Sequence, residues 1–403
     1  MAASPIQVPR VVLAGGGTGG HVYPALAVAA ALRAQRPQTQ FLFVGGNRLE
    51  ARLVPASGLR FRAISVHGLA GRGLSDMPRR LRSLAELALG LPLLQSLAAL
   101  RRFRPHVVIG TGGYVSGPVL LAAYLLRIPC LALDGNRTPG WTSRALARIV
   151  DGIAVAHHDA ARLLSPRLRR GAHVSVTGLP VRPEIAALTR EAGAAALALD
   201  PALTTLLALG GSLGSQRMND ALVGALGILG RRDEWVETVQ VVHVTGERYA
   251  ARRSEPEDRG LPRGYRAVAY LGPHYPDSLA AADLVVSRAG ASTVAEITAR
   301  GLPAVLIPWS GAATGEQMLN AEPLARAGAA VIIPDHELTP ERLAQVLEDL
   351  LGDEEKRARM ARASRELGRP RAAEQVAGMA LDLAEKRGRP HASARGSSDG
   401  RSA

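Results

Sequence analysis

Hydrophobic positions along this chain fall into short runs that end in glycines, each followed by a longer apolar segment. The first run, Val11–Ala14, ends in "GGGTGGH", and "ALAVAAALRAQ" after Tyr23–Pro24 predicts a helix with Pro24 near its first turn. Residues 106–118 repeat the strand-then-glycine pattern, and residues 40–46, 128–136 and 152–156 are further short apolar runs. Buried strands that alternate with helices predict a parallel α/β sheet.

The same pattern restarts in the second half of the chain. Residues 204–220 again predict a strand, a glycine loop and a helix, and strands are expected within 239–246, 284–290 and 303–309. We therefore expect two Rossmann-like domains, residues 1–178 and 179–385, whose parallel sheets face a deep interdomain cleft. Residues 386–403 are polar, basic and poor in apolar positions, which predicts a disordered tail.

Length and composition agree with a folded protein of two domains. The 403 residues are enough for two cores, and the single cysteine, Cys130, excludes a disulfide framework and fits a reducing compartment. The segment "MAASPIQVPR" lacks the apolar core of a signal peptide. No run of about 18 apolar residues is free of charge and proline, so we expect no membrane-spanning helix.

The net charge of the chain limits the classes of partner that it is expected to bind. A formal net charge of +14 suits nucleic acid, an anionic membrane surface or a phosphorylated ligand. Only 3% of the residues are aromatic, which argues against stacking platforms for single-stranded nucleic acid, and no DNA-reading motif is present. We therefore expect no nucleic acid partner, and a membrane surface or a polyphosphate ligand remains.

The first glycine loop has the spacing G-x-G-x-x-G at Gly15, Gly17 and Gly20. A dinucleotide site also needs an acid at the end of the second strand, where "GGN" stands instead and Glu50 comes late. A tight turn without a ligand is a second interpretation. A third is a backbone loop that a bulky acceptor approaches closely, with His21 at the helix start facing the cleft. His21 is then either a catalytic base or a residue that only shapes the loop.

The second half of the chain is expected to form the opposite wall of the interdomain cleft. Residues 290–293 are predicted to begin a helix, where N–H groups and the helix dipole favour a pyrophosphate. Glu296, about one turn further, fits either a ribose contact or a capping box with Ser292 or Thr293. Ser212 in "GGSLGS" is a phosphate donor or part of a plain turn. No D-x-D pair follows a strand, and the histidines and cysteine lack metal-ligand spacing, so we expect no metal site.

Six motifs in order carry a specific resemblance. They are "GGGTGGHVYPALAVA", "GTGGYVSGP", "GLPVRPEI", "GGSLGS", "SRAGASTVAEITARGLPAVLIPW" and "EQMLNAEPLARAGAA". Together they resemble the MurG family of peptidoglycan N-acetylglucosaminyltransferases, over about residues 11–384. The resemblance implies a GT-B fold with an acceptor- and membrane-binding first domain and a UDP-GlcNAc-binding second domain.

The resemblance also implies an activity. The family transfers GlcNAc from UDP-GlcNAc to the C4 hydroxyl of MurNAc on undecaprenyl-pyrophosphoryl-MurNAc-pentapeptide, with inversion and without a metal or other cofactor. His21 is the implied base and Asp134 the second catalytic candidate. The implied substrate-binding residues are Thr18, Gly19, Gly20, Tyr114, Asn136, Arg182, Ser212, Leu271, Ala291, Ser292, Thr293, Val294, Ala295, Glu296, Gln317 and Asn320.

Within this set the resemblance implies particular contacts. Leu271 is expected at the uracil and Glu296 at the ribose. Arg182 and Ser212 are expected near the phosphates. Asn136 and Gln317 are expected at the sugar, with Asn320 supporting a helix start.

A membrane location follows from the same resemblance. Residues 71–105 combine leucines with seven arginines, which fits either a helix lying in an anionic interface or an ordinary amphipathic helix. We expect a peripheral protein at the cytoplasmic face of the plasma membrane, with other cell-wall and division proteins among its partners.

The chain also departs from the family pattern in the cleft. "LDGN" at residues 133–136 replaces "HEQN", so Leu133 stands where the family has a histidine. Leu179 replaces an asparagine and Leu213 a glutamine. These changes keep open a related GT-B glycosyltransferase with another acceptor, a UDP-sugar epimerase, or a weakened paralogue that binds a nucleotide sugar.

Overall fold

The predicted strands form the centres of two parallel sheets in the computed structural model, which describes residues 8–66, 90–211, 214–231, 233–252, 261–262, 264–311 and 315–388. Within these residues the first sheet has seven strands, in the order β3-β2-β1-β4-β5-β6-β7. Its strands are β1 (Arg10–Ala14), β2 (Gln40–Gly45), β3 (Arg60–Ala63), β4 (Val107–Gly110), β5 (Cys130–Asp134), β6 (Gly152–Val155) and β7 (His173–Val176).

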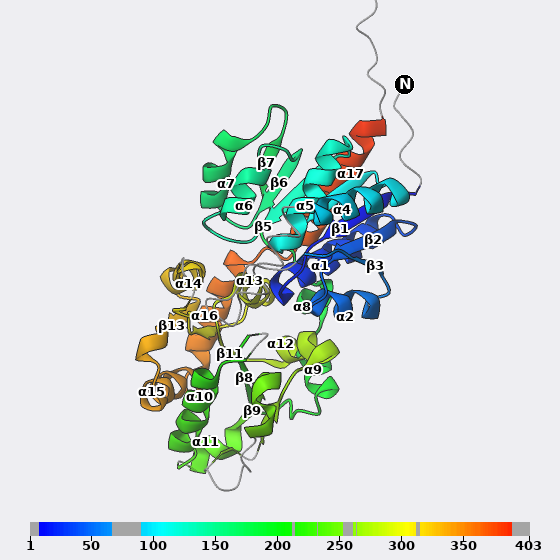
Figure 1. The fold of residues 1–403 in the computed structure, drawn as a ribbon. Helices are drawn as coiled ribbons and strands as arrows, with labels where there is room; N and C mark the ends of the chain where they lie inside the picture. The colour runs from blue at the N-terminus through cyan, green and yellow to red at the C-terminus, as the bar shows by residue number, and fades with distance from the viewer. Residues whose placement is uncertain are drawn as a thin grey trace, which may run out of the picture.

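The second sheet has six strands in the described residues, in the order β10-β9-β8-β11-β12-β13. Its strands are β8 (Thr204–Leu209), β9 (Val239–Val244), β10 (Gly264–Val268), β11 (Leu284–Ser287), β12 (Ala304–Leu306) and β13 (Ala330–Ile332). Neighbouring strands pair in parallel throughout both sheets. The predicted pair of Rossmann-like α/β domains is therefore confirmed, and Figure 1 shows the two lobes.

Helices cover both faces of each sheet, because alternate residues of every central strand point to opposite sides. Val11 and Leu13 of β1 lie in one core cluster, and Val12 and Ala14 lie in the cluster on the other face. The α-helices are α1 (Gly19–Gln35), α2 (Leu49–Ala56), α4 (Leu91–Phe103), α5 (Gly113–Leu125), α6 (Trp141–Leu146), α7 (His158–Leu164), α8 (Pro183–Ala187), α9 (Arg190–Ala196), α10 (Gln216–Leu229), α11 (Asp233–Thr238), α12 (Tyr275–Ala281), α13 (Ala291–Arg300), α14 (Glu316–Arg326), α15 (Pro340–Leu351), α16 (Glu354–Leu367) and α17 (Ala372–Gly388).

Helix α1 begins earlier than the sequence pattern predicts. It starts at Gly19, so Pro24 lies inside the second turn and not near the first. A proline has no N–H, and the carbonyl of Gly20 therefore lacks its usual intrahelical donor. That carbonyl accepts the hydroxyl of Ser292 from the second domain at 3.4 Å.

Both sheets reverse their strand order at one point, and the glycine loops lie there. In the first sheet the chain leaves β1 toward β2 and leaves β4 toward β5, so the turns that begin α1 and α5 are neighbours. In the second sheet the same relation holds for β8 and β11, which lead to α10 and α13. Ligands of open α/β sheets bind at such reversal points, beyond the carboxyl ends of the strands.

Helix α17 returns to the first domain. Residues Val376, Ala377 and Ala380 of α17 are fully buried in the same core cluster as α1 and β1. The Gln35 side chain donates to the Glu374 carbonyl at 3.2 Å. Figure 1 shows α17, in red, among the blue and cyan elements of the first lobe.

The predicted domain ranges change accordingly. A division near residue 178 stays a proposal, but α17 lies within the range predicted for the second domain and packs on the first. Helix periodicity shows that one face is buried and does not show against which sheet it packs. The helix also extends to Gly388, so the predicted tail from residue 386 is helical at its start, and residues 389–403 lie outside the described part.

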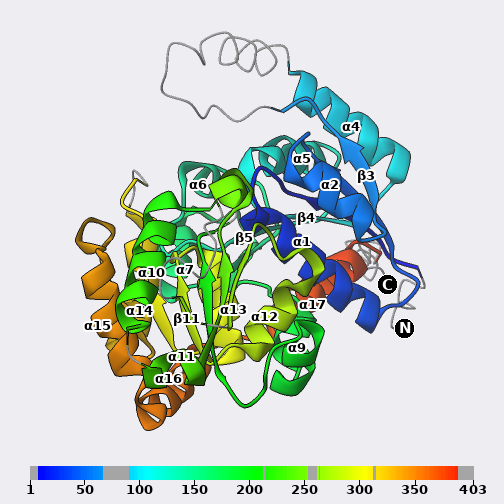
Figure 2. The ribbon, with the colours of Figure 1, turned by 90° about the horizontal axis from the view of Figure 1, so that it is seen from below.

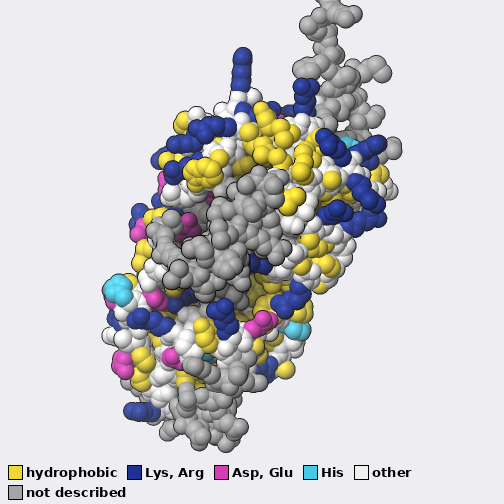
Figure 3. Space-filling view, viewed as in Figure 1, with side chains coloured by type: hydrophobic (Ala, Val, Ile, Leu, Met, Phe, Trp, Pro, Cys, Tyr) yellow, Lys and Arg dark blue, Asp and Glu magenta, His cyan; other side chains and the backbone are white. Residues whose placement is uncertain are grey.

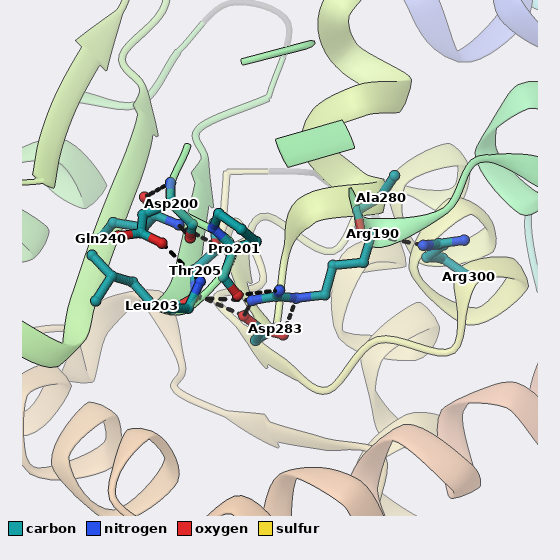
Figure 4. A network of polar contacts seen from close by, with 10 residues as sticks. Arg190, Asp200, Pro201, Leu203, Thr205, Gln240, Ala280, Asp283 and Arg300 are labelled. Atoms are coloured by element: carbon teal, nitrogen blue, oxygen red, sulfur yellow. Dashed lines mark hydrogen bonds and ion pairs between the residues drawn. The ribbon is translucent and has the colours of Figure 1, made fainter. Parts of the chain in front are cut away.

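A polar network fastens the second sheet at the end away from the glycine loops (Figure 4). The Arg190 guanidinium donates to both carboxylate oxygens of Asp283, at 3.0 and 2.9 Å. It also donates to the carbonyls of Pro201 and Leu203, and Asp283 accepts the backbone N–H of Thr205 at 2.8 Å. One ion pair thus ties α9 to the segments that enter β8 and β11.

We expect Asp283→Ala to lower the free energy of unfolding by about 2 kcal/mol, because Arg190 and the Thr205 N–H lose a shared acceptor. Chemical denaturation measures this change. Asp349→Ala is the control, since Asp349 pairs with Lys356 on the surface, and its expected effect is at most about 0.5 kcal/mol. Equal losses in the two variants would contradict a structural role for the network.

Candidate active site

A cavity of about 1030 Å³ lies between the two domains, at the carboxyl ends of both sheets. The loops after β1, β4 and β5 line one wall, and the loops after β8 and β11 line the other. Most of the predicted site residues meet there. The cavity is lined by the predicted residues Thr18, Gly19, Gly20, His21, Tyr114, Asp134, Asn136, Arg182, Leu271, Ala291, Ser292, Thr293, Glu296 and Gln317.

Three predicted residues lie elsewhere. Val294 is buried in the core of the second domain, because its position on α13 faces the sheet, and Ala295 is also not part of the cavity wall. Asn320 is buried and donates to the carbonyl of Ala289 at 3.1 Å, just before α13 begins, and so holds the start of a different helix from its own. Ser212 lies outside the described residues.

His21 is held in one orientation by the loop after β4. Its Nδ1 lies 3.1 Å from the carbonyl oxygen of Thr111, and the Thr111 hydroxyl donates to the His21 carbonyl at 2.7 Å. A carbonyl only accepts, so Nδ1 carries the proton, and Nε2 of the neutral ring keeps a free lone pair. Burial lowers the pKa of His21, which favours this neutral form.

Gly112 makes room for this histidine. A Cβ at Gly112 would lie 2.5 Å from His21 Nδ1, and the backbone there has φ of +105°. Both facts require glycine. Gly112 therefore forms a turn and also leaves the space that the His21 imidazole occupies.

Glu50 supports the first glycine loop from below. Its side chain is fully buried, and Oε2 accepts the N–H of Gly17 at 3.0 Å. A Cβ at Gly16 or Gly46 would lie within 2.8 Å of the carboxyl group. The sequence pattern suggests Glu50 only as the acid of a dinucleotide site. No local pattern indicates that its buried side chain supports the glycine loop.

Asp134 ends β5 at the cavity wall. One carboxylate oxygen accepts the N–H of Asn136 at 2.9 Å. Burial raises the pKa of Asp134, and its contacts with Ser143 and Asn136 oppose that rise. The carboxyl group therefore has the cavity position and the shifted acidity of a second catalytic candidate.

Three of the residues that depart from the family pattern, Leu133, Gly135 and Leu179, line the cavity. Leu133 is buried in the core of the first domain, and Leu179 lies on the cavity wall. A Cβ at Gly135 would lie 3.0 Å from a methyl carbon of Leu179. The loss of a side chain at residue 135 thus accompanies the larger apolar side chain at residue 179, and this part of the wall is apolar.

Several helices that begin at the cavity have uncapped first turns. Within the described residues α1, α5 and α13 follow Thr18, Gly112 and Gly290, and none receives a side-chain cap. Helix α10 also begins at the cavity and is capped by the Ser215 side chain, which accepts the N–H of Met218. The uncapped N–H groups at the cavity are suited to an anionic ligand such as a pyrophosphate.

Glu296 does not form the capping box that its spacing allowed. Its Oε2 accepts the hydroxyl of Tyr275 at 2.7 Å, and Oε1 lies 3.7 Å from a guanidinium nitrogen of Arg182. Arg182 stacks between the rings of Tyr23, 4.5 Å away, and Tyr275, 5.0 Å away. Burial raises the pKa of Glu296, and Arg182 and Tyr275 oppose that rise. The acid faces the cavity and is held from two sides.

The domains also touch directly beside this cluster. The hydroxyls of Tyr23 and Tyr270, from the first and second domains, lie 2.8 Å apart. Gln317 is held by its side-chain oxygen, which accepts the N–H of Trp309 at 2.9 Å. Within the described residues no group of three or more His, Cys, Asp or Glu side chains has the arrangement of a metal site.

Comparison with known proteins agrees with this fold. The model of the glycosyltransferase family 28 N-terminal domain matches residues 11–155, and that of the family 28 C-terminal domain matches residues 205–376. The fold and the cavity thus define a two-domain GT-B glycosyltransferase.

Curated relatives identify the branch of this class. A protein of Moorella thermoacetica is 41% identical over 93% of this chain and 99% of its own, and one of Desulforamulus reducens is 40% identical over 90% and 95%. Both are called UDP-N-acetylglucosamine–N-acetylmuramyl-(pentapeptide) pyrophosphoryl-undecaprenol N-acetylglucosamine transferase. The crystal structure of Acinetobacter baumannii MurG is similar at 26% identity and a TM-score of 0.67, covering 93% of this chain and 99% of that one. The chain belongs to the MurG family.

Proposed function

We propose that this chain transfers GlcNAc from UDP-GlcNAc to the MurNAc C4 hydroxyl of undecaprenyl-pyrophosphoryl-MurNAc-pentapeptide, which converts lipid I to lipid II in peptidoglycan synthesis. Membership of the MurG family supports this assignment. The observation that carries it is the pairing of a neutral His21 on one wall with the uncapped start of α13 and Glu296 on the other. One wall thus offers a base, and the other offers a nucleotide site.

His21 and the helix start would share the chemistry. Nε2 of His21 takes the proton of the C4 hydroxyl while that oxygen forms a bond to the anomeric carbon of GlcNAc. The bond from this carbon to the UDP oxygen breaks, and attack from the opposite face inverts the centre. Negative charge on the departing pyrophosphate is stabilised by N–H groups of α13 and by Arg182. The proposal includes no metal ion or other cofactor.

The donor contacts are part of the proposal. Glu296 would accept the ribose hydroxyls, and Leu271 would contact the uracil. Asn136 and Gln317 would hold the sugar, while residues 18–20 and Ser212 would lie near the sugar and phosphates. Asp134 is the alternative base.

A peripheral location at the cytoplasmic face of the plasma membrane is proposed from the surface of the first domain. Five exposed apolar side chains on the packed helices α4 and α5 make up what we call the apolar patch, and Arg101, Arg102 and Arg127, on or next to these helices, are also exposed. Figure 3 shows hydrophobic and basic side chains together on this domain. The apolar patch consists of Leu91, Leu94, Leu121, Tyr124 and Leu125.

Other observations bear on the same surface. In the described residues no helix is long and apolar enough to cross a bilayer. Of the predicted segment 71–105, residues 71–89 lie outside the described part. Partnership with other cell-wall and division proteins is proposed from the family alone.

We expect Leu94→Asp with Leu125→Asp to weaken binding to vesicles that contain anionic lipid about tenfold or more, since these leucines are 58% and 54% exposed. Vesicle co-sedimentation measures the change. Ile228→Asp with Leu367→Asp is a matched control, because it places two aspartates on exposed apolar sites of the second domain. Equal binding by the two variants would remove the apolar patch as the membrane contact.

The test of the proposed function is release of UDP from UDP-GlcNAc, measured in EDTA with and without a short-chain lipid pyrophosphate-MurNAc-pentapeptide. Release that depends on this acceptor supports the assignment. Donor binding without release would favour another acceptor or a binding paralogue. That result would draw attention to the apolar wall formed by Leu133, Gly135 and Leu179.

A further inference from the structure

The carboxylate of Glu296 has one close partner. In the part of the chain that the structure describes, its one direct hydrogen bond comes from the Tyr275 hydroxyl, at 2.7 Å. Arg182 lies 3.7 Å away, which is an ion-pair distance and too long for a hydrogen bond. The orientation of the carboxylate therefore depends on Tyr275.

The direction of this hydrogen bond is fixed. Burial and the nearby Glu296 raise the pKa of Tyr275 well above its usual value, so the phenol keeps its proton and donates. An ionised carboxylate has about four lone-pair positions, of which Tyr275 occupies one. Arg182 faces the other carboxylate oxygen at 3.7 Å, and Glu296 is part of the cavity wall, where a ligand can use the remaining lone pairs.

Arg182 is held by different contacts. Its guanidinium is sandwiched between the rings of Tyr23 and Tyr275, and its Nε is buried without a hydrogen-bond partner among the described residues. Stacking thus fixes the plane of the cation, and the tyrosine hydroxyl fixes the anion. Tyr275 contributes to both, through its ring and its hydroxyl.

We propose that Tyr275 is a positioning residue that orients the Glu296 carboxylate toward the ribose hydroxyls and thereby makes the site select a ribonucleotide over a 2′-deoxyribonucleotide. This inference rests on the proposed function, because it takes the donor to be a uridine nucleotide. A carboxylate held at one oxygen by a fixed donor presents its remaining lone pairs in a defined direction, and only hydroxyls placed to meet them gain from it.

Calorimetric binding of UDP and 2′-deoxy-UDP tests the selection directly. We expect Tyr275→Phe, which keeps the ring under Arg182, to weaken UDP binding about tenfold and 2′-deoxy-UDP binding about threefold or less. The wild-type preference for UDP thus shrinks in the variant. An unchanged ratio of the two affinities would overturn the proposal, even if both affinities fall.

The pH dependence of UDP binding is a second readout. The charged and titratable groups that face Glu296 are Arg182, Tyr275 and Tyr23. Donation from Tyr275 stabilises the ionised carboxylate, so its loss raises the pKa of Glu296. The acidic limb of UDP binding should therefore move to higher pH in Tyr275→Phe, and a limb that stays in place counts against the proposal.

Tyr265→Phe is the matched control. It removes a tyrosine hydroxyl in the same domain that has, in the described part of the chain, no hydrogen bond to Glu296. This hydroxyl lies 2.8 Å from Nδ1 of His243. We expect this variant to keep the wild-type preference and pH limb, and a thermal melt of each variant reports its folding. A wild-type protein that binds no UDP overturns the proposed function, whereas wild-type selection retained in Tyr275→Phe overturns only this inference.

Discussion

Replacing His21 with alanine is expected to lower kcat about 10²–10⁴-fold and to leave donor affinity within about twofold. The imidazole carries its proton on Nδ1, which faces the Thr111 carbonyl at 3.1 Å, so Nε2 is the group that can accept one. Alanine removes that acceptor without touching Glu296 or the start of α13. The loss should therefore appear in turnover.

The pH dependence of kcat is a second test of His21 as the base. Burial lowers the pKa of His21, so the ring stays neutral at pH 7. It becomes charged only when the pH falls below the usual pKa of a histidine. Wild-type kcat should fall on that acidic side, and in His21→Ala this limb should disappear from the residual rate.

His336→Ala serves as the control for this prediction. Its imidazole is 76% exposed, and the Arg217 side chain contacts only the His336 backbone carbonyl. The control should retain wild-type turnover. Near-normal turnover by His21→Ala would instead transfer the base role to Asp134, whose raised pKa then becomes the quantity to examine.

The second large effect is expected at Glu296. Glu296→Ala should raise the KM for UDP-GlcNAc about 10- to 100-fold with a smaller change in kcat, because it removes the proposed ribose acceptor and leaves Tyr275 and Arg182 without their partner. Steady-state kinetics with varied donor measures the split, and calorimetry with UDP measures binding alone.

Two further variants sharpen this prediction. Glu296→Gln keeps the size of the side chain and removes its charge, so a loss close to that of alanine would assign the effect to the carboxylate. Glu184→Gln, on the exposed surface of α8, is the matched control and should bind UDP normally. Unchanged UDP affinity in both Glu296 variants would contradict the ribose contact.

The sequence predicts the sheet centres well because buried parallel strands are continuous apolar runs. Residues 11–14 and 206–209 are of this kind, and both lie in central strands. The edge strands β3, β7, β10 and β13 were not predicted, since their residues are mostly exposed or half-buried. The packing partner of α17 was equally hidden, because a buried helix face does not name the sheet it covers.

The site was predictable where a motif fixes the backbone. The loops that carry His21 and Glu296 open helices after apolar strands, and both side chains line the cavity. Glu50 and Tyr275 were not predicted. Glu50 contacts the glycine loop around Gly17, which is 33 residues earlier in the chain. Tyr275 contacts Glu296, which is 21 residues later, through one hydroxyl. Such contacts depend on tertiary packing, which local spacing does not encode.

The return of α17 to the first domain has a consequence for how the protein is made. Helix α17, through residues such as Val376, Ala377 and Ala380, completes a core whose members outside this helix are all synthesised earlier. At about 5–20 residues per second, the ribosome needs roughly 10–40 s to pass from the end of β7 to the start of α17. During that interval one face of the first sheet has α1 but lacks α17. The N-terminal domain is therefore begun first and completed only by α17, and a nascent chain should depend on a chaperone most strongly before α17 emerges.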